Sequence, residues 1–408
     1  MSTSERIVII GGGLAGAKTA EALRNHGHTG SVTLIAAEHH LPYERPPMSK
    51  DYLAGKVPFD SAVVHAQSWY DEQHVVLRQG VSATAIDTGA HSVTLDDGTS
   101  LPYDKLVLAT GSAVRTLPID GADADNVHYL RTVEDADAIR ATFGPGKRLV
   151  VIGGGWIGLE VTAAARAADT TVTILEGLEL PLLRVLGPTI AQVFADLHVA
   201  HGVELRTAVR IAAIDTSGPH ATGVRLEGGE VIPADAIVIG VGVSPVTDLA
   251  EAAGIAVDNG VLVDGSLRTS DPDVYAVGDI ANHDHPVLGH RVRVEHWATA
   301  LNQPAAAVAA LLGGEEQYTE LPYFYTDQYD LGCEYIGHAT GPDDRVVVRG
   351  DLASREFVAF WMDRDDRILA AMNVNVWDVI DRIKPLIAAR RSVDPVRLAD
   401  PATPYEQL

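Results

Sequence analysis

One local pattern occurs twice in this chain: a buried strand, a glycine-rich turn and a helix. The two copies are Ile7-Val-Ile-Ile-Gly-Gly-Gly-Leu-Ala-Gly16 and Leu149-Val-Val-Ile-Gly-Gly-Gly-Trp-Ile-Gly158. Each continues into an alanine-rich helical stretch and a second apolar strand that precedes an acid, 32–35 before Glu38 and 172–175 before Glu176. The separation of the last glycine from the acid is near the ~20 residues typical of a dinucleotide-binding fold. Because two complete units are far stronger evidence than one fingerprint, we predict two Rossmann-like dinucleotide-binding domains.

Three of the four glycines of the first copy, Gly11, Gly13 and Gly16, each meet a different steric demand. The first permits the tight turn, the second lets the backbone approach a pyrophosphate, and the third allows the helix to pack closely on the strand. The helix that follows directs its free N–H groups and positive dipole end at the phosphates, and the acid accepts hydrogen bonds from the ribose. The first site therefore comprises Gly11, Gly13, Leu14, Ala15, Gly16 and Glu38.

The second copy repeats this arrangement with Gly153, Gly155 and Gly158. Glu176 should accept the ribose hydroxyls of NADH and repel the additional phosphate of NADPH. No arginine follows this acid until Arg184, which we also assign to the NADH site. We therefore predict that the second site prefers NADH.

Turn-rich segments mark the domain boundaries. Strands are expected at 106–109 and 236–241, and both end in small residues. The turn-rich segments 115–121 and 242–245 flank the second dinucleotide-binding unit. These flanking turns predict that the second unit is inserted into the first. After an alanine-rich helix at 305–312, alternating aromatic and β-branched residues predict an antiparallel sheet. We predict an α/β protein with a first domain of residues 1–113 and 243–317, an inserted domain of 114–242 and a C-terminal α+β domain of 318–408.

Composition excludes several classes of protein. A formal net charge of -24 argues against a general nucleic-acid or membrane surface. The single cysteine, Cys333, cannot form an intramolecular disulfide, a dithiol pair or a cysteine-rich metal site, so we expect a small buried residue there and no metal. The chain begins without a secretory leader pattern and has no apolar run near the ~18 residues that span a bilayer, which predicts a cytoplasmic protein.

Three further segments carry a family resemblance: Leu41-Pro-Tyr-Glu-Arg-Pro-Pro-Met-Ser-Lys50, Ala109-Thr-Gly111 and Tyr275-Ala-Val-Gly-Asp-Ile280. Together they resemble the FAD-dependent pyridine nucleotide–disulfide oxidoreductases, and the proline-rich stretch resembles the ferredoxin, putidaredoxin and rubredoxin reductases. The resemblance covers nearly the whole chain and implies FAD in the first domain and NADH in the inserted one. Besides the first glycine turn and its acid, it assigns to FAD Arg45, Pro46, Pro47, Lys50, Ala83, Ala109, Thr110, Gly111, Arg131, Gly278, Asp279, Glu295, His296 and Trp297.

The same resemblance implies roles for these residues. Gly278 and Asp279 would bind the ribityl chain, Arg45 would lie near the phosphates or adenine, and the two prolines would wall the isoalloxazine ring. Ala83 would offer its backbone to the adenine, and residues 295–297 would lie at the pyrimidine side of the flavin. Two alternatives stay open: Arg131 as an exposed cation beside a helix, and Trp297 as an ordinary core residue.

The resemblance also adds Trp156, Ile157, Glu160 and Gly242 to the NADH site. It implies that Lys50 and Glu160 pair beside the flavin, where the lysine would stabilise negative charge on the reduced ring and the glutamate would order the lysine and orient the nicotinamide. Trp156 is expected to cover the flavin and move when nicotinamide arrives, with fixed packing between domains as the alternative. We expect Lys50, Glu160, Trp156 and Trp297 to be the catalytic set.

The absent cysteines bear on the electron acceptor. Relatives in the superfamily that reduce disulfides or peroxides carry cysteine after the first acid, whereas residues 42–50 of this chain contain none. The segment Tyr323-Phe-Tyr-Thr-Asp-Gln-Tyr-Asp330 resembles the opening of the C-terminal domain of ferredoxin reductases. We therefore expect hydride transfer from NADH to FAD and one-electron transfer to a small iron–sulfur ferredoxin, which would serve a cytochrome monooxygenase or a ring-hydroxylating dioxygenase.

Two other functions share these motifs: an NADH oxidase or monodehydroascorbate-type reductase with a small-molecule acceptor, and a redox-signalling flavoprotein similar to apoptosis-inducing factor. For an acidic ferredoxin, a basic cluster near the C-terminus is the candidate docking surface, with a mixed solvated face as the alternative. Its residues are Arg382, Lys384, Arg390, Arg391 and Arg397, with Arg291 and Arg293 as further candidates.

Overall fold

The computed structural model describes residues 5–339, 341 and 344–408, and it divides into two compact units. Unit 1 consists of Met1–Arg45, Asp60–Ala113 and Val243–Tyr323, and unit 2 of Pro46–Phe59, Val114–Gly242 and Phe324–Leu408. Residues 1–4, at the start of the predicted first domain, lie outside the described residues. The division into three domains stays a prediction.

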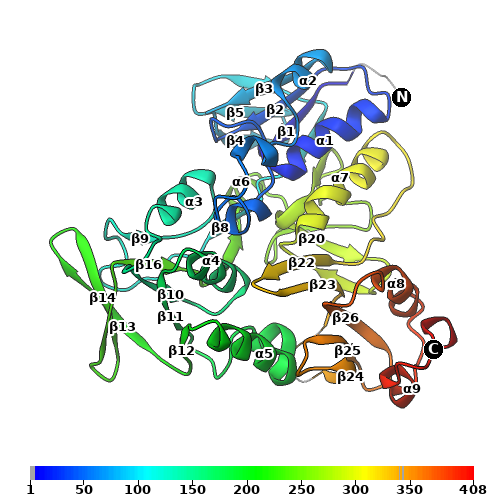
Figure 1. Ribbon diagram of the computed structural model, residues 1–408. Helices are drawn as coiled ribbons and strands as arrows, with labels where there is room; N and C mark the ends of the chain where they lie inside the picture. Colours follow the sequence, from blue (N-terminus) through cyan, green and yellow to red (C-terminus); the bar gives the residue numbers. More distant parts are fainter. Residues whose placement is uncertain (1–4, 340, 342–343) are drawn as a thin grey trace. The chain divides into compact units, whose positions relative to one another are not determined.

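Unit 1 is built on a parallel sheet of short, apolar strands. The strand order is β19-β7-β1-β2-β3, with β19 at Val274–Ala276, β7 at Lys105–Leu108, β1 at Ile7–Ile10, β2 at Val32–Ala36 and β3 at Val75–Gln79. In the parallel register Ile7 of β1 lies opposite Val32 of β2 and Lys105 of β7. Helices α1 (Leu14–Asn25) and α7 (Trp297–Leu311) lie side by side against this sheet (Figure 1).

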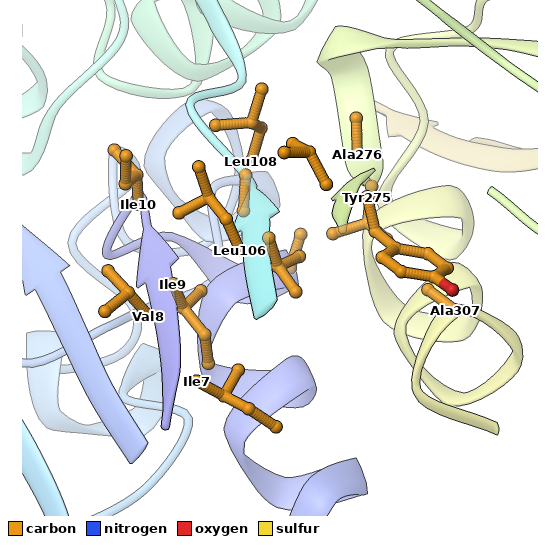
Figure 2. Close-up of a cluster of buried hydrophobic side chains, with 14 of the residues drawn as sticks. Ile7, Val8, Ile9, Ile10, Leu106, Leu108, Tyr275, Ala276 and Ala307 are labelled. Atoms are coloured by element: carbon orange, nitrogen blue, oxygen red, sulfur yellow. The ribbon is translucent and has the colours of Figure 1, made fainter. Parts of the chain in front are cut away.

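The core of unit 1 explains why its glycine turn is held in place. Side chains of β1, β7, β19 and α7 meet in one buried cluster, of which Figure 2 labels Ile7, Ile9, Leu106, Leu108, Tyr275 and Ala307. All four residues of β1 are buried, as expected for a strand covered on both faces. The carboxyl end of β1 runs directly into the turn, so packing of the strand positions the turn.

The other elements of unit 1 are short. An antiparallel sheet contains β4 (Ala83–Asp87), β5 (Ser92–Leu95) and β6 (Ser100–Pro102), and another sheet has the order β18-β20-β21 (Val261–Val263, Ala281–His285 and His290–Val292). The helical elements are α2 (Gln67–Glu72), α6 (Asp248–Ala252) and the 3-10 turn η3 (Gly278–Ile280). Near the unit boundaries are η2 (Phe59–Ala62), β8 (Ser112–Val114) and β17 (Val243–Pro245).

Unit 2 repeats the parallel architecture around β10. The strand order is β12-β11-β10-β16-β9, with β12 at Glu204–Arg206, β11 at Thr171–Leu175, β10 at Arg148–Ile152, β16 at Ala236–Ile239 and β9 at Val127–His128. Its helices are α3 (Val133–Arg140), α4 (Trp156–Ala167), α5 (Leu183–Ala200) and the 3-10 turn η1 (Pro46–Ser49). A smaller antiparallel sheet contains β13 (Ile211–Ser217), β14 (His220–Leu226) and β15 (Val231–Pro233).

The C-terminal part of unit 2 contains the antiparallel sheet that the sequence predicts. The strand order is β22-β23-β26-β25-β24, with β22 at Tyr323–Gln328, β23 at Leu331–Gly337, β26 at Ile368–Val374, β25 at Glu356–Met362 and β24 at Arg345–Asp351. The helical elements that follow are α8 (Ile380–Ala388), α9 (Pro395–Ala399) and η4 (Tyr405–Gln407). Trp361 of β25 is fully buried, and its indole N–H donates to the Leu186 carbonyl of α5 at 3.2 Å.

The predicted fold class is confirmed: two parallel α/β parts and an antiparallel C-terminal sheet are present. One predicted helix is wrong in extent, since α7 begins at Trp297 and not at 305. Pro304 resembles a helix breaker in the sequence, but the helix continues through it, and buried Thr299 and Gln303 belong to its first half. Among the described residues, no helix has both the length and the apolar character needed to cross a membrane.

Candidate dinucleotide sites

In the first glycine turn, Gly11 and Gly16 are required by the packing of the backbone itself, whereas Gly13 is not. Gly11 has a φ of +123°, and a Cβ there would lie 2.1 Å from the Ala109 carbonyl oxygen. A Cβ on Gly16 would lie 1.9 Å from the carbonyl oxygen of Gly11. Gly13, the N-cap of α1, has an ordinary φ of -88°, and a Cβ there would meet nothing within 4 Å. The open space at Gly13, beside free N–H groups of the helix, fits the pyrophosphate of a dinucleotide.

The second glycine turn likewise contains two glycines that backbone packing requires and one that it does not. A Cβ on Gly153, whose φ is +104°, would lie 2.3 Å from the Gly240 oxygen, and a Cβ on Gly158 would lie 2.2 Å from the Gly153 oxygen. At Gly155 the nearest atom is 4.0 Å away. The two turns therefore leave the same position open, and the second also fits a pyrophosphate.

The acid of unit 1 belongs to a small polar cluster after β2. The Tyr43 hydroxyl donates to Glu38 Oε2 at 2.7 Å, and the Arg45 guanidinium forms an ion pair with Glu38. Arg45 also lies over the Tyr43 ring, 4.4 Å from its centroid. About a third of the Glu38 side chain is exposed, so its carboxylate has room for further donors. Arg45, which is expected near the phosphates or the adenine, thus lies beside Glu38, the carboxylate predicted to bind the ribose.

The Gly-Asp turn of η3 is brought to the first turn of α1. Gly278 has a φ of +79°, and a Cβ there would lie 3.1 Å from the Ala15 Cβ. The Gly278 N–H donates to Gln303 of α7 at 2.8 Å, which fixes the turn, and Asp279 follows in η3. Sequence segments far apart in the chain therefore meet at the start of α1, and ribityl binding by Gly278 and Asp279 stays a prediction.

The remaining unit 1 residues lie in loops and at element ends. The Thr110 hydroxyl donates to the Val246 carbonyl at 2.8 Å, next to buried Ala109 and to Gly111, whose φ is +68°. Ala83 is the first residue of β4. His296 is the N-cap of α7, after Glu295, which pairs with Arg293 at 2.7 Å.

Trp297, the first residue of α7, is half-buried rather than part of the core. Its indole N–H donates to Glu44 Oε2 at 3.1 Å. This hydrogen bond ties the start of α7 to the proline-rich loop. Contact between the indole and a flavin stays a prediction.

Glu176, the acid that follows the second glycine turn, accepts hydrogen bonds from two backbone N–H groups. Glu176 Oε2 accepts the Gly154 N–H at 2.6 Å, and Oε1 accepts the Leu178 N–H at 2.8 Å. The carboxylate therefore holds the glycine turn in shape, while each oxygen keeps a lone pair for another donor. Arg184 is exposed on α5, and Gly242 is exposed with a φ of +99°.

The structure pairs Lys50 with Glu160, as predicted. Lys50 Nζ donates to Glu160 Oε1 at 2.8 Å, and the side chains are 15% and 4% exposed. Glu160, on α4, also accepts from the hydroxyls of Ser49 in η1 and Thr326 in β22. Three donors around one buried carboxylate compensate for its lost hydration. The Lys50 ammonium lies 5.5 Å from the centroid of the Tyr325 ring.

Trp156 is the first residue of α4 and packs within unit 2. Its indole contacts Phe194 of α5 edge-on, with centroids 5.4 Å apart, and Phe324 of β22 at 5.0 Å. These contacts correspond to the packing alternative, and movement of the indole stays a prediction. Ile157 beside it is 42% exposed, and its side chain therefore offers apolar surface at the second glycine turn. Pro47 lies in η1 with Ser49, and Arg131 directly precedes Thr132, the N-cap of α3.

Sequence reasoning missed a buried polar line beyond Glu160. It consists of Thr326 and Gln328 of β22, each 1% exposed, and His198 of α5, which is fully buried. Burial, with a smaller electrostatic contribution from nearby His201, lowers the pKa of His198 from its usual 6.5 to about 4. The one available signal was the polar residues at alternate, inward positions of a predicted strand.

The predicted docking cluster is largely occupied by partners within the protein. Arg382 pairs with Glu406 at 2.8 Å, and Arg391 and Arg397 donate to backbone carbonyls of the last two residues of the chain. Lys384 lies 3.4 Å from Asp381. In unit 1, Arg291 donates to Val263 and Asn282 carbonyls, and Arg293, 7% exposed, donates to the Asp279 carbonyl. These cations hold chain segments in place, which sequence spacing alone does not reveal.

Cys333 is buried, as expected, and burial raises the pKa of its thiol. A small residue in an apolar setting is its role in the sheet. Within the described parts of the chain, no group of three or more His, Cys, Asp or Glu residues is arranged to hold a metal ion.

Comparison with known proteins agrees with this geometry. Residues 5–304 match the family model described as pyridine nucleotide-disulphide oxidoreductase, and residues 323–408 match the one described as reductase C-terminal. The chain is 44% identical over 98% of both lengths to the anthranilate 1,2-dioxygenase system ferredoxin–NAD(+) reductase component of Burkholderia cepacia. It is 38% identical to putidaredoxin reductase of Pseudomonas putida, over 100% of this chain and 97% of that protein. A crystal structure of the covalent putidaredoxin reductase–putidaredoxin complex superimposes with a TM-score of 0.95 at 38% identity, covering 99% and 97% of the two chains.

Proposed function

We propose, from the premise that this chain belongs to the pyridine nucleotide-disulphide oxidoreductase family, that it is an NADH-dependent ferredoxin reductase containing FAD. The observation that carries the proposal is the pair of glycine turns, each with its middle position open to a ligand. Two adenine dinucleotides, one for each turn, satisfy that geometry. The match to the pyridine nucleotide-disulphide oxidoreductase family supports the assignment of FAD and NADH to these turns, and one similar protein is named a ferredoxin–NAD(+) reductase component.

In the proposed reaction, the protein supplies position and charge. When bound, FAD and NADH would supply the hydride and single-electron chemistry, which belongs to the cofactors and not to the side chains. Lys50 would supply an ammonium to stabilise the negative charge that develops on the flavin, and Glu160 would keep that ammonium ordered through their 2.8 Å ion pair. The turn at Gly11–Gly16 would hold one pyrophosphate, and Glu38 would accept hydrogen bonds from the ribose of that dinucleotide.

A ferredoxin is the proposed acceptor. Several similar proteins are named as ferredoxin reductase components of dioxygenase systems, and one solved relative is bound to putidaredoxin. Residues 42–50 contain no cysteine, so this segment has no sulfur relay to a disulfide or peroxide. We therefore propose a small iron–sulfur protein, with a cytochrome monooxygenase or a ring-hydroxylating dioxygenase downstream. Use of intracellular NADH supports a cytoplasmic location, which cell fractionation would test.

The function is tested by comparing acceptors under steady state. The purified flavoprotein should oxidise NADH, and ferredoxins encoded by the same organism should be reduced much faster than dioxygen or quinones. Faster turnover with a small molecule than with any ferredoxin would replace the proposal with an oxidase or a small-molecule reductase. Slow reoxidation with every acceptor, together with an NADH-dependent oligomeric state, would favour a redox-signalling flavoprotein.

Replacing Glu176 by Arg should shift preference from NADH toward NADPH. Loss of the acceptor for the ribose hydroxyls should weaken NADH binding roughly tenfold or more, the worth of one hydrogen bond to a charged group. The arginine should attract the additional phosphate of NADPH. The ratio of kcat/KM for the two cofactors is the measurement, with Glu179→Arg as a nearby control. An unchanged ratio would mean that Glu176 does not contact the ribose.

A further inference from the structure

Hydrogen bonds join Glu160 to the buried line of Thr326, Gln328 and His198, and join His198 to Tyr329. Thr326 Oγ1 donates to Glu160 Oε1 at 2.6 Å, and Gln328 Nε2 donates to Thr326 Oγ1 at 3.2 Å. His198 Nε2 lies 2.9 Å from Gln328 Oε1, and the Tyr329 hydroxyl lies 3.2 Å from His198 Nδ1. All five residues belong to unit 2. The line runs from the Lys50–Glu160 pair to the half-buried Tyr329.

The donor and acceptor of each hydrogen bond in this line can be assigned by starting from the Glu160 carboxylate. A carboxylate paired with a lysine only accepts hydrogen bonds, so the Thr326 proton points at Glu160 and the Thr326 oxygen accepts from the Gln328 amide nitrogen. The Gln328 oxygen then faces His198, so the hydrogen of the neutral imidazole must lie on Nε2. Nδ1 is left to accept from the Tyr329 hydroxyl. Burial keeps His198 neutral, with a pKa of about 4.

We propose that Thr326, Gln328 and His198 are positioning residues that hold Glu160, and through it Lys50, in the geometry that flavin reduction requires. The proposal rests on the proposed function. Each donor in the line points toward the same negative charge, and such aligned hydrogen bonds polarise one another in a low-dielectric interior. The line also connects three elements, α4, β22 and α5, so the position of the carboxylate is set from outside its own helix.

Thr326→Val tests the first step because valine keeps the shape and removes the donor. We expect the limiting rate constant for anaerobic flavin reduction by NADH to fall roughly tenfold, the effect of losing one hydrogen bond to a charged group. The apparent Kd for NADH should change much less. Thr326→Ser should restore the rate because it keeps the hydroxyl. Gln328→Met should lower the rate in the same direction, but less, because Thr326 keeps its own hydroxyl.

Thr162→Val is the matched control. Thr162 is also fully buried and lies on α4 near Glu160, but its hydroxyl donates to the Gly158 carbonyl at 2.8 Å and not to the line. It should reduce at the wild-type rate. A wild-type rate in Thr326→Val, or a rate in Thr326→Ser as low as in the valine variant, would overturn the proposal.

A second readout separates this proposal from the proposed function. In ¹⁵N-histidine NMR spectra at neutral pH, the signal lost in His198→Gln should show a neutral ring with its proton on Nε2. A ring protonated on Nδ1, or on both nitrogens, would refute the hydrogen-bond line. If NADH fails to reduce the wild-type flavin, the proposed function fails, and the NMR result still decides whether the line exists.

Discussion

Replacing Gly13 by Val should give a folded protein that is purified without flavin. Nothing lies within 4 Å of the Cβ position of Gly13, and its φ of -88° suits any residue, so the unliganded turn can accept the side chain. The valine would fill the space that the pyrophosphate needs. Losing even one or two of its charge-assisted hydrogen bonds should weaken FAD binding by roughly 100-fold or more. Flavin absorbance per protein and the circular dichroism spectrum are the measurements.

Gly155→Val is the matched control, since the same position of the second turn is open. This variant should retain FAD but bind NADH poorly, whereas Gly16→Ala should fail to fold because its Cβ meets backbone. A yellow Gly13→Val protein with normal flavin content would mean that the first turn does not hold the pyrophosphate. A colourless Gly155→Val protein would mean that the two turns are not separate sites.

Replacing Lys50 by Met should slow flavin reduction by NADH roughly 100-fold, the size expected when one group that stabilises developing charge is removed. Methionine preserves the length of the buried stem but brings no ammonium. Glu160 would still accept from the Ser49 and Thr326 hydroxyls, so we expect the protein to fold and to bind FAD. Anaerobic stopped-flow absorbance of the flavin is the measurement.

Lys56→Met is the control for removing a lysine from the same segment. Lys56 pairs with Asp51 at 3.2 Å, but its side chain is 68% exposed, so the pair contributes little. It should be reduced at the wild-type rate. If Lys50→Met is equally fast, Lys50 stabilises the fold and not the reaction.

Much of the fold was readable from local patterns. The all-buried strand β1 and the largely buried β10 run straight into glycine turns, and both turn and strand are specified by adjacent residues. Helix α7 was predicted too short because the residues before Pro304 include polar side chains whose burial depends on distant partners. Gln303, for example, is buried because it accepts from the Gly278 N–H.

Site residues that lie close together in the sequence could likewise be predicted from local patterns, whereas contacts between distant segments could not. The ion pair of Lys50 and Glu160 was predicted only through a family resemblance, since the residues are far apart in the chain. The line through Thr326, Gln328 and His198 was not predicted, because no local pattern shows that a strand and a helix will bring their polar side chains together. The sequence also does not show the partners of basic residues such as Arg382, because their acidic or carbonyl partners lie in other segments.

The proposed ribose contact would give the Glu176 carboxylate a second task besides holding the glycine turn, and this constrains any redesign of the coenzyme preference. Its oxygens accept the Gly154 and Leu178 N–H groups, so a basic residue at this position would also remove two supports of the second glycine turn. An efficient NADPH enzyme built on this scaffold should therefore need a compensating acceptor nearby, and single substitutions should trade catalytic efficiency for selectivity.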